Sequence, residues 1–553
     1  MRYLYKETEE IIKERKKTEM KKVGKKILTG VITAGMVLSA MSMSALADDG
    51  GVTSTPGSLT ADGTISVTEV QNGDTAVYYQ IVKRNTETGE WELNGKYGDL
   101  SIGDITDSVS AEEAHTISGH LTGDGIAMTA DDDGTTLSAT VDPGTYVVVI
   151  TPGSNNSGVV YNPVVVSSDY DGENHTNTAV AKKTEVTVDK KAGNTADDND
   201  NKDVAVGDEI SYTITPVIPL FPKNYTAPVY KVTDTLSAGL ELADANGDKK
   251  VDASDITVNN VDPSNYTITI NGNSGFTVSF NSDYLKGLTT APTDVTITYK
   301  AKVTSDATYS VNEMTNTAKI NFSNSPSDTT GNGTDSDQTN HYTFTLDGTL
   351  KGSWTDEEQI VNKELIKTAV DKDGKPVLET KYTYTTGESK TTKASPLAGA
   401  TFKLTGGNLG DNGKTCTTDA NGFITFAGLD AGTYTLTEVS APAGYVKDSN
   451  EHTVVIVPTY DKDADGNEIL TSYKVTIDGA DAANFSVSNP GTANVETKKE
   501  GSTIYTSLIS NVKAAGLPAT GGVGTTMFYV IGGVLVAGAA ILLITKRRMN
   551  GHQ

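Results

Sequence analysis

Three polar residues late in the chain fall where the alternation of a β-strand points side chains inward. Glu438 shares a strand face with Tyr434 and Leu436, and Lys367 and Asn511 alternate with apolar neighbours in the same way. Burying an amine, a carboxylate and a carboxamide is unfavourable unless each finds a partner. Burial also lowers the pKa of a lysine and raises that of a carboxyl group, so a neutral amine could meet a protonated acid. These residues indicate either a hydrogen-bonded buried cluster or a site of amine chemistry.

The middle of the chain repeats this combination on other strands. Lys190 shares a face with Val186 and Val188, whereas its neighbour Lys191 faces outward. Asp234 and Asn316 lie on faces that are otherwise apolar, with Tyr230, Val232, Leu236, Ala318, Ile320 and Phe322. A second inward set of lysine, acid and asparagine is therefore predicted.

Short β-strands would position these residues. The chain contains alternating runs rich in Thr, Val, Tyr and Ile, and Asp/Asn/Gly turns separate them. The pattern is typical of all-β sandwiches. A chain of 553 residues is too long for one core, and we expect domains at 48–182, 183–345 and 355–515. The polar segment 323–340 is predicted to be a loop or linker. Only one cysteine, Cys416, is present, which excludes an intramolecular disulfide as a covalent staple.

Several motifs of the third domain cluster around Glu438. They are Pro396–Leu404, Thr418–Gly422, Gly432–Glu438 and Ala441–Tyr445. Together they closely resemble the prealbumin-like B-type repeat of collagen adhesins and pilins, including the pilin E-box at Glu438. The resemblance implies an autocatalytic isopeptide bond between Lys367 and Asn511. Protonated Glu438 would polarise the Asn511 carbonyl and shuttle protons as the neutral amine attacks.

The other two domains differ from each other in whether they contain the residues for such a bond. The segment Lys231–Leu240 resembles the Ig-like, isopeptide-forming domain of fimbrial proteins, which implies a Lys190–Asn316 bond with Asp234 as catalyst. In the first domain, Asp142–Tyr146 parallels Asp430–Tyr434, and Ile150 then occupies the position of Glu438. Because an apolar residue cannot supply the acid, we predict no isopeptide bond there.

Both ends of the chain carry apolar segments with basic neighbours. Residues 1–47 read as a secretory signal peptide, with Lys21, Lys22, Lys25 and Lys26 before an apolar run and Ala45-Leu46-Ala47 at the cleavage site. Met20 is a candidate for the true start codon. At the other end, Leu517-Pro518-Ala519-Thr520-Gly521 precedes an apolar run at 527–544, predicted to be a transmembrane helix, and a basic cytoplasmic tail at 545–553. This order resembles the cell-wall sorting signal of Gram-positive surface proteins, which sortases cut between Thr and Gly.

A sortase-built polymer needs a lysine that accepts the carbonyl of Thr520. Pilins place this lysine in a Tyr-Pro-Lys-Asn motif, which Phe221-Pro222-Lys223-Asn224 resembles. If the strand at Glu185–Lys190 runs away from the first domain and Glu209–Val217 runs back, Lys223 lies near the junction of the two domains. An ordinary exposed loop lysine is the alternative at this position, and Lys182 and Lys183 are the rival acceptors.

One acidic loop resembles a calcium site. Oxygen-bearing side chains occupy positions 1, 3, 5, 9 and 12 of a dockerin-like loop: Asp244, Asn246, Asp248, Asp252 and Asp255. Lys249 stands where the usual glycine would be. The loop could hold Ca²⁺, and a solvated acidic turn is the alternative; no other cofactor is expected.

The resemblances imply a structural shaft subunit of a covalently polymerised pilus that supports adhesion and colonisation. Its partners would be pilus and housekeeping sortases, identical subunits, peptidoglycan, tip or basal pilins and a host ligand. A non-polymerised, wall-anchored adhesin is the alternative. The formal net charge of −26 argues against nucleic-acid binding. No catalytic constellation beyond single-turnover bond formation is predicted, and the mature protein is expected to be secreted and anchored to the cell wall.

Overall fold

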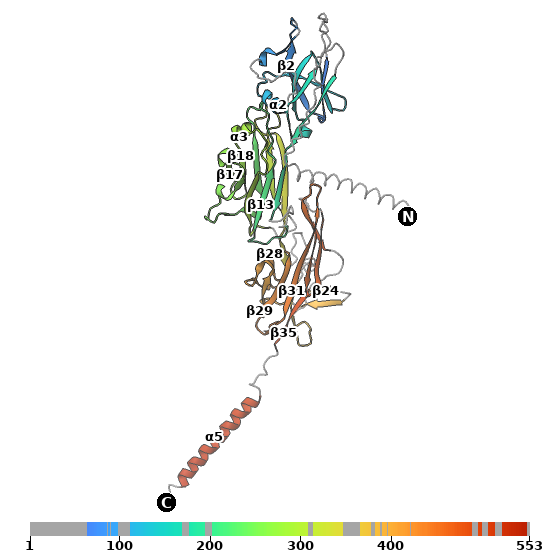
Figure 1. Cartoon of the computed structure of the whole chain (residues 1–553). Coiled ribbons are helices and arrows are strands. Elements are labelled where there is room, and N and C mark those ends of the chain that lie inside the picture. Colours follow the sequence, from blue (N-terminus) through green and yellow to red (C-terminus); the bar gives the residue numbers. More distant parts are fainter. Residues whose placement is uncertain are drawn as a thin grey trace, which may run out of the picture. The chain divides into compact units, whose positions relative to one another are not determined.

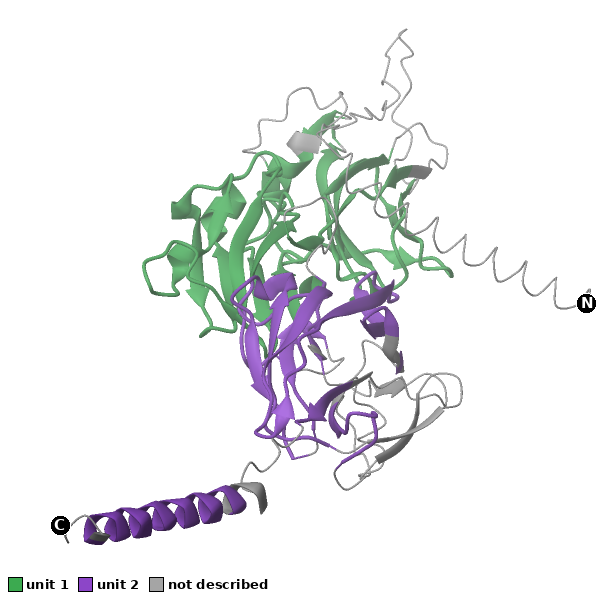
Figure 2. Ribbon diagram, turned by 90° about the horizontal axis from the view of Figure 1, so that it is seen from below, with its two compact units in different colours: residues 1–200, 209–302, 315–339 green, residues 201–208, 303–314, 340–553 purple. Residues whose placement is uncertain are grey.

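The computed structural model describes most of the chain between residues 63 and 549. The described residues are 63–97 without 86 and 89, 111–168, 176–193, 202–307, 313–346, 365–377, 382–386, 390–394, 396–488 without 421, 496–499, 507–514 and 523–549. Strands dominate them (Figure 1), so the predicted all-β fold is confirmed. The chain divides into two compact units (Figure 2), one made of 1–200, 209–302 and 315–339 and the other of 201–208, 303–314 and 340–553. The predicted signal peptide and the motif 517–521 lie outside the described residues.

The first domain packs two sheets of short strands. The strands are β1 (Gly63–Thr68), β2 (Thr75–Arg84), β3 (Trp91–Leu93), β4 (Ile126–Ala127), β5 (Thr129–Ala130), β6 (Thr136–Val141), β7 (Gly144–Thr151), β8 (Val159–Tyr161), β9 (Val164–Ser168) and β10 (Thr176–Val180). One sheet has the order β10-β1-β6-β5, and the other β3-β2-β7-β9 with β4 beside β2. Strand β7 is apolar on both faces: Ile150 lies in the core between the sheets, and Val149 packs with Ile117 of helix α2 (Ala111–Ser118). The helix therefore covers the outer face of this sheet.

The second domain is a sandwich of two five-stranded sheets. Its strands are β11 (Lys183–Glu185), β12 (Val188–Ala192), β13 (Glu209–Pro216), β14 (Tyr230–Leu236), β15 (Leu240–Leu242), β16 (Thr257–Asn259), β17 (Tyr266–Ile270), β18 (Gly275–Phe280), β19 (Thr296–Val303), β20 (Met314–Phe322) and β21 (Gly333–His341), with helix α3 (Ser282–Gly287). The sheet orders are β12-β13-β19-β15, with β16 on β19, and β17-β18-β14-β20-β21. Strand β11 instead pairs with β8 of the first domain.

Strand β21 corrects one expectation from the sequence. Residues 323–340 were predicted to be a loop or linker because the segment is polar throughout, but Gly333–His341 is a strand hydrogen-bonded to β20. The prediction was wrong because an edge strand can be stabilised by its polar side chains as well as by an apolar face.

The third domain is built on a seven-stranded sheet. The strands are β22 (Phe344–Leu346), β23 (Leu365–Val370), β24 (Tyr382–Thr386), β25 (Lys390–Ala394), β26 (Thr401–Gly406), β27 (Lys414–Thr417), β28 (Phe426–Leu429), β29 (Gly432–Ser440), β30 (Tyr445–Val446), β31 (Glu451–Lys462), β32 (Glu468–Ile477), β33 (Ala480–Ser488), β34 (Glu496–Lys499) and β35 (Ser507–Lys513). The large sheet has the order β27-β26-β29-β31-β32-β33-β34, and β23-β35-β30 forms a second one. Phe402, Leu436 and Ile509 join the two sheets in one core, to which β22 adds Phe344 and Leu346.

The last described element is helix α5 (Val523–Met549), whose final turn holds Lys546, Arg547 and Arg548. Within it, Met527–Arg548 has a mean hydropathy of 2.5 and is long and apolar enough to cross a membrane. Its apolar side chains are exposed, as those of a lipid-facing helix would be.

Candidate cross-link sites

The second-domain set comes together between the two facing sheets. Lys190 lies on β12 of one sheet, and Asp234 and Asn316 lie on the adjacent strands β14 and β20 of the other. Their exposed fractions are 1%, 1% and 0%, so the inward orientation expected from alternation is present at all three positions. Lys191, by contrast, is only half-buried.

A tyrosine that the sequence reasoning missed links the three groups. The Lys190 amine contacts the Asp234 carboxylate directly and donates to the Tyr299 hydroxyl at 2.6 Å. That hydroxyl also accepts from Asn316 Nδ2 at 2.8 Å and donates to Asp234 Oδ1 at 2.7 Å. Two acceptor positions and one donor are the full capacity of a phenol. Tyr299 therefore holds the lysine amine, the carboxyl group and the amide nitrogen around one oxygen.

Aromatic rings exclude water from this site. The Lys190 amine lies 4.9 Å from the centre of the Tyr212 ring and 5.2 Å from that of Tyr299, and the two rings stack at 5.2 Å. Phe276 meets Tyr299 edge-on at 4.8 Å. A low dielectric strengthens every polar interaction inside and penalises free charge.

The burial has a direct electrostatic consequence. It lowers the pKa of Lys190, although the charge of Asp234 acts in the opposite direction. Burial likewise raises the pKa of Asp234. Both shifts favour moving the proton from the amine to the carboxyl group, which leaves a neutral, nucleophilic lysine.

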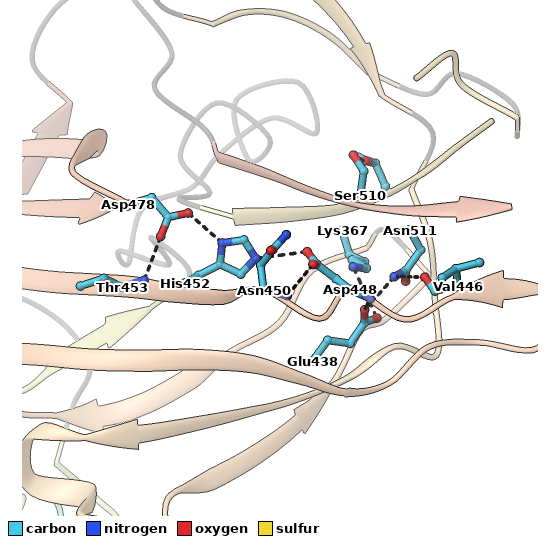
Figure 3. Close-up of polar contacts among 11 residues, drawn as sticks. Lys367, Glu438, Val446, Asp448, Asn450, His452, Thr453, Asp478, Ser510 and Asn511 are labelled. Carbon is cyan, nitrogen blue, oxygen red and sulfur yellow. Dashed lines mark hydrogen bonds and ion pairs between the residues drawn. The ribbon is translucent and has the colours of Figure 1, made fainter. Parts of the chain in front are cut away.

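The third-domain set combines neighbouring strands with the facing sheet (Figure 3). Strands β23 and β35 run parallel, with Lys367 opposite Ile509 and Ala369 opposite Asn511. Lys367 and Asn511 therefore share a face, two positions apart on adjacent strands. Glu438 approaches from β29, and the exposed fractions of the three residues are 1%, 0% and 2% in the order Lys367, Asn511, Glu438.

The Glu438 carboxylate lies between the amine and the amide. One of its oxygens is 3.4 Å from Lys367 Nζ, and the other accepts from Asn511 Nδ2 at 2.7 Å. Three buried atoms, Lys367 Nζ, Glu438 Oε1 and Asn511 Oδ1, have no hydrogen-bond partner. They are the nucleophile, the proton acceptor and the carbonyl oxygen that an isopeptide reaction would use. Unsatisfied groups of this kind are unfavourable in a purely structural cluster.

Strand β30 and the loop that follows it complete this site. Val446 O accepts from Asn511 Nδ2 at 2.9 Å, and Asp448 N donates to Glu438 Oε2 at 2.6 Å. The Asp448 carboxylate is in turn 3.2 Å from His452 Nε2, as Figure 3 shows. Burial, with the Phe402 ring centre 5.0 Å from the amine, lowers the pKa of Lys367. A neutral amine is therefore favoured here too.

The described first domain has a buried polar cluster without an amine. Asp74 accepts from the Tyr161 hydroxyl at 2.6 Å and from Asn156 Nδ2 at 3.2 Å, and all three residues are buried. Ile150, at the position that corresponds to Glu438, belongs to the apolar core. No lysine is buried among the residues of this domain that the structure describes. The prediction that it forms no bond remains a prediction.

Lys223 lies against the first domain. Its backbone N–H donates to Ser118 Oγ at 3.0 Å, at the end of α2, and its side chain passes close to Gly119. The amine donates to Lys286 O, at the end of α3, and lies 3.5 Å from Leu288 O. The rivals lie in the connecting chain, where Lys182 is exposed and Lys183 is half-buried on β11.

The loop predicted to bind calcium is closed by its own hydrogen bonds. The Asp244 carboxylate accepts from the backbone of Gly247 at 2.7 Å, and the Asp255 carboxylate accepts from Ala245 at 2.8 Å. Asp252 pairs with Lys250 and caps the turn Ala253–Asp255. Among the described residues, no group of three His, Cys, Asp or Glu side chains is arranged to hold a metal ion. Calcium binding remains a prediction.

Comparisons with known proteins agree with this architecture. The family model described as SpaA: Prealbumin-like fold domain matches residues 387–469, within the third domain. The Trypsin-resistant surface T6 protein of Streptococcus pyogenes serotype M6 is 25% identical, over 88% of this chain and 94% of its own length. The solved T6 backbone pilin of the same serotype aligns with a TM-score of 0.50 at 19% identity, covering 83% of this chain and all of that structure. The chain is therefore similar, over nearly its whole length, to a streptococcal backbone pilin, and it contains a SpaA-type prealbumin-like domain.

Proposed function

We propose that this protein is a structural shaft subunit of a covalently polymerised surface pilus, stiffened by two internal Lys–Asn isopeptide bonds. The observation that carries the proposal is the pair of buried sets. In the second domain, the acid contacts the lysine amine and the tyrosine hydroxyl that binds the asparagine. In the third domain, the acid contacts both the lysine amine and the asparagine amide. Similarity to a backbone pilin over most of the chain supports the same function.

In the second domain, the lone pair of neutral Lys190 attacks Cγ of Asn316. The Nζ–Cγ bond forms and the Cγ–Nδ2 bond breaks. Asp234, protonated by the transfer from lysine, polarises the amide carbonyl, then gives this proton to Nδ2 and takes one from Nζ, so that it ends as protonated as it began. Ammonia leaves, so no oxidant or cofactor is needed. The hydroxyl of Tyr299 keeps Nδ2 and the acid in contact throughout.

The third-domain reaction has the same balance, with Lys367 as nucleophile, Asn511 as electrophile and Glu438 as the proton carrier. Here the backbone carbonyl of Val446 orients the leaving amide nitrogen. These are single-turnover reactions of the protein on itself, and the protein is not an enzyme for an external substrate.

Polymerisation would join Thr520 to a lysine of the next subunit. A pilus sortase cleaves between Thr520 and Gly521, and we assign Lys223 as the acceptor because it lies beside the first domain at Ser118 and Gly119. Two carbonyl oxygens hold its amine, so the amine must be released before it can react. A housekeeping sortase would attach the last subunit to peptidoglycan, which retains the polymer at the cell wall.

Surface extracts of the native host test the proposal. A shaft subunit gives a sortase-dependent ladder of high-molecular-weight bands, and Lys223→Arg abolishes it. Lys182→Arg and Lys183→Arg are the matched controls and leave the ladder intact. A single band in the wild type would instead indicate an anchored, non-polymerised adhesin, and loss of the ladder only with a control variant would move the acceptor to that lysine.

A further inference from the structure

Strand β21 carries acidic residues that the proposed reaction does not use. It is the end strand of its sheet and lies next to β20, which carries Asn316. Its sequence, Gly-Thr-Asp-Ser-Asp-Gln-Thr-Asn-His, places Asp335 and Asp337 two positions apart. Alternate strand residues share a face, so both carboxylates project in the same direction.

These two carboxylates bind the backbone of the strand that carries the reactive lysine. Val188 N donates to Asp335 Oδ2 at 2.9 Å, and Lys190 N donates to Asp337 Oδ2 at 2.7 Å. The backbone of residues 187 and 193 faces β13 instead. Thr187 O accepts from Val217 N at 2.8 Å, and Gly193 N donates to Ser211 O at 2.8 Å. The N–H groups of the even-numbered residues therefore point away from β13. At that edge of β12, the two carboxylates occupy the place of a neighbouring strand.

Strand β21 thus connects the two strands that would be cross-linked. On one side it is hydrogen-bonded to β20, with Thr317 Oγ1 donating to Gln338 Oε1 at 3.0 Å. On its other side, residues 335 and 337 follow 188 and 190 in the same chain direction. We propose that Asp335 and Asp337 are positioning residues that anchor the edge of β12 to β21, and so hold the Lys190 amine at Asn316. This inference rests on the proposed isopeptide function.

Side-chain alternation already sets the register of β12, because Val188, Lys190 and Ala192 share its buried face. The acceptors on β21 would bind the N–H groups of residues 189 and 191 equally well after a shift of one residue. Their role is therefore to hold the edge of the strand, and each contact is assisted by charge.

Tryptic peptide mapping of the full-length chain, made by cell-free synthesis in detergent and sampled over time, tests this role. The branched peptides Lys190–Asn316 and Lys367–Asn511 are quantified by mass spectrometry. We expect Asp335→Ala with Asp337→Ala to form the Lys190–Asn316 peptide at least tenfold more slowly. The Lys367–Asn511 peptide of the same molecules should be unchanged, which shows that the third domain is folded. Amide hydrogen exchange in β14 and β20 should match the wild type, which shows that the second domain is folded too.

Two further variants separate positioning from other effects. Asp337→Asn keeps an acceptor oxygen but removes the charge that raises the pKa of Lys190, so it should react at least as fast as the wild type. Ser336→Ala, at the exposed position between the two acids, is the matched control and should behave as the wild type. A double alanine variant with wild-type kinetics would overturn the positioning role. Absence of both branched peptides from the wild type would instead contradict the proposed isopeptide function itself.

Discussion

At the scale of single residues, the two candidate sites solve the same problem differently. In the second domain, the Tyr299 hydroxyl contacts the lysine, the acid and the asparagine. In the third domain, Glu438 contacts both reactants itself, and three polar atoms remain without hydrogen-bond partners. The second site leaves one such atom, Asn316 Oδ1, whereas the third leaves three, which include the amine and an oxygen of the acid.

The first prediction concerns Tyr299. Tyr299→Phe keeps the ring stack on Tyr212 but removes the hydroxyl that holds Asn316 against Asp234. Loss of one positioned hydrogen-bond donor slows active-site chemistry by about 10²–10³-fold, and we expect a decrease of that order in Lys190–Asn316 formation. Time-resolved peptide mapping measures it. Tyr266→Phe, on the half-buried strand β17, is the control; equal rates in both variants would remove Tyr299 from the site.

The second prediction is a pH dependence of stability. Asn511→Ala leaves Lys367 as a free buried amine, and burial lowers its pKa in the folded state below the ordinary value of 10.5. The unfolded chain then binds more protons between these two values, so the free energy of unfolding of this variant rises as pH increases through that window. Denaturant titrations of the third-domain transition at several alkaline pH values measure the slope.

The control for this slope adds Lys367→Met to Asn511→Ala, which removes the titrating amine. The wild type should match the control, because an amide-bonded lysine does not titrate. If all three proteins gave the same slope, the prediction that burial lowers the pKa of the Lys367 amine would be wrong.

At the scale of elements, alternation was enough to predict the sheets and the inward polar residues. Glu438, Lys190 and Asn316 lie where period-two counting puts them, because each belongs to a strand whose other inward residues are apolar. Tyr299 was missed although its strand was predicted, because a tyrosine among Ile297, Ala301 and Val303 reads as ordinary core. Its signal was that a buried phenol needs a hydrogen-bond partner. Strand β21 was missed because it contacts β12 through carboxylates, and a polar segment shows no apolar alternation from which a strand could be predicted.

The turn before β28 gives a prediction at this scale. Gly422 has φ +75° and accepts from Lys367 N at 2.8 Å, and a Cβ there would lie 2.4 Å from Lys367 O. Gly422→Ala should therefore destabilise the third domain by more than about 2 kcal/mol and reduce Lys367–Asn511 formation. Gly466, with φ +94° and nothing within 4 Å, is the matched control. Gly466→Ala should cost about 1–2 kcal/mol from its backbone alone and leave the bond intact. Equal bond yields in the two variants would contradict the argument.

At the scale of the whole molecule, the chain contains one cysteine and two candidate staples. We predict that the intact mass of the purified protein is lower than the sequence mass by two molecules of ammonia; a deficit of none or three would contradict the assignment. Each bond would close a loop of more than about 100 residues, which by analogy with disulfides contributes roughly 4–5 kcal/mol. Asn316→Ala and Asn511→Ala should each restore one ammonia mass and lower the stability of one domain by that order.

The position of β21 has a mechanical consequence for a subunit under tension. With Lys223 as the acceptor, pulling force would enter inside the loop that Lys190 and Asn316 close, and would leave that loop at Asn316. In the third domain it would bypass the residues between Lys367 and Asn511. The stretch 317–366, which contains β21 and β22, lies outside both closed loops and would carry the full load. Its carboxylate contacts with β12 would break one at a time and re-form on release. The strand that anchors β12 during maturation would then act as a reversible spring between the two closed loops.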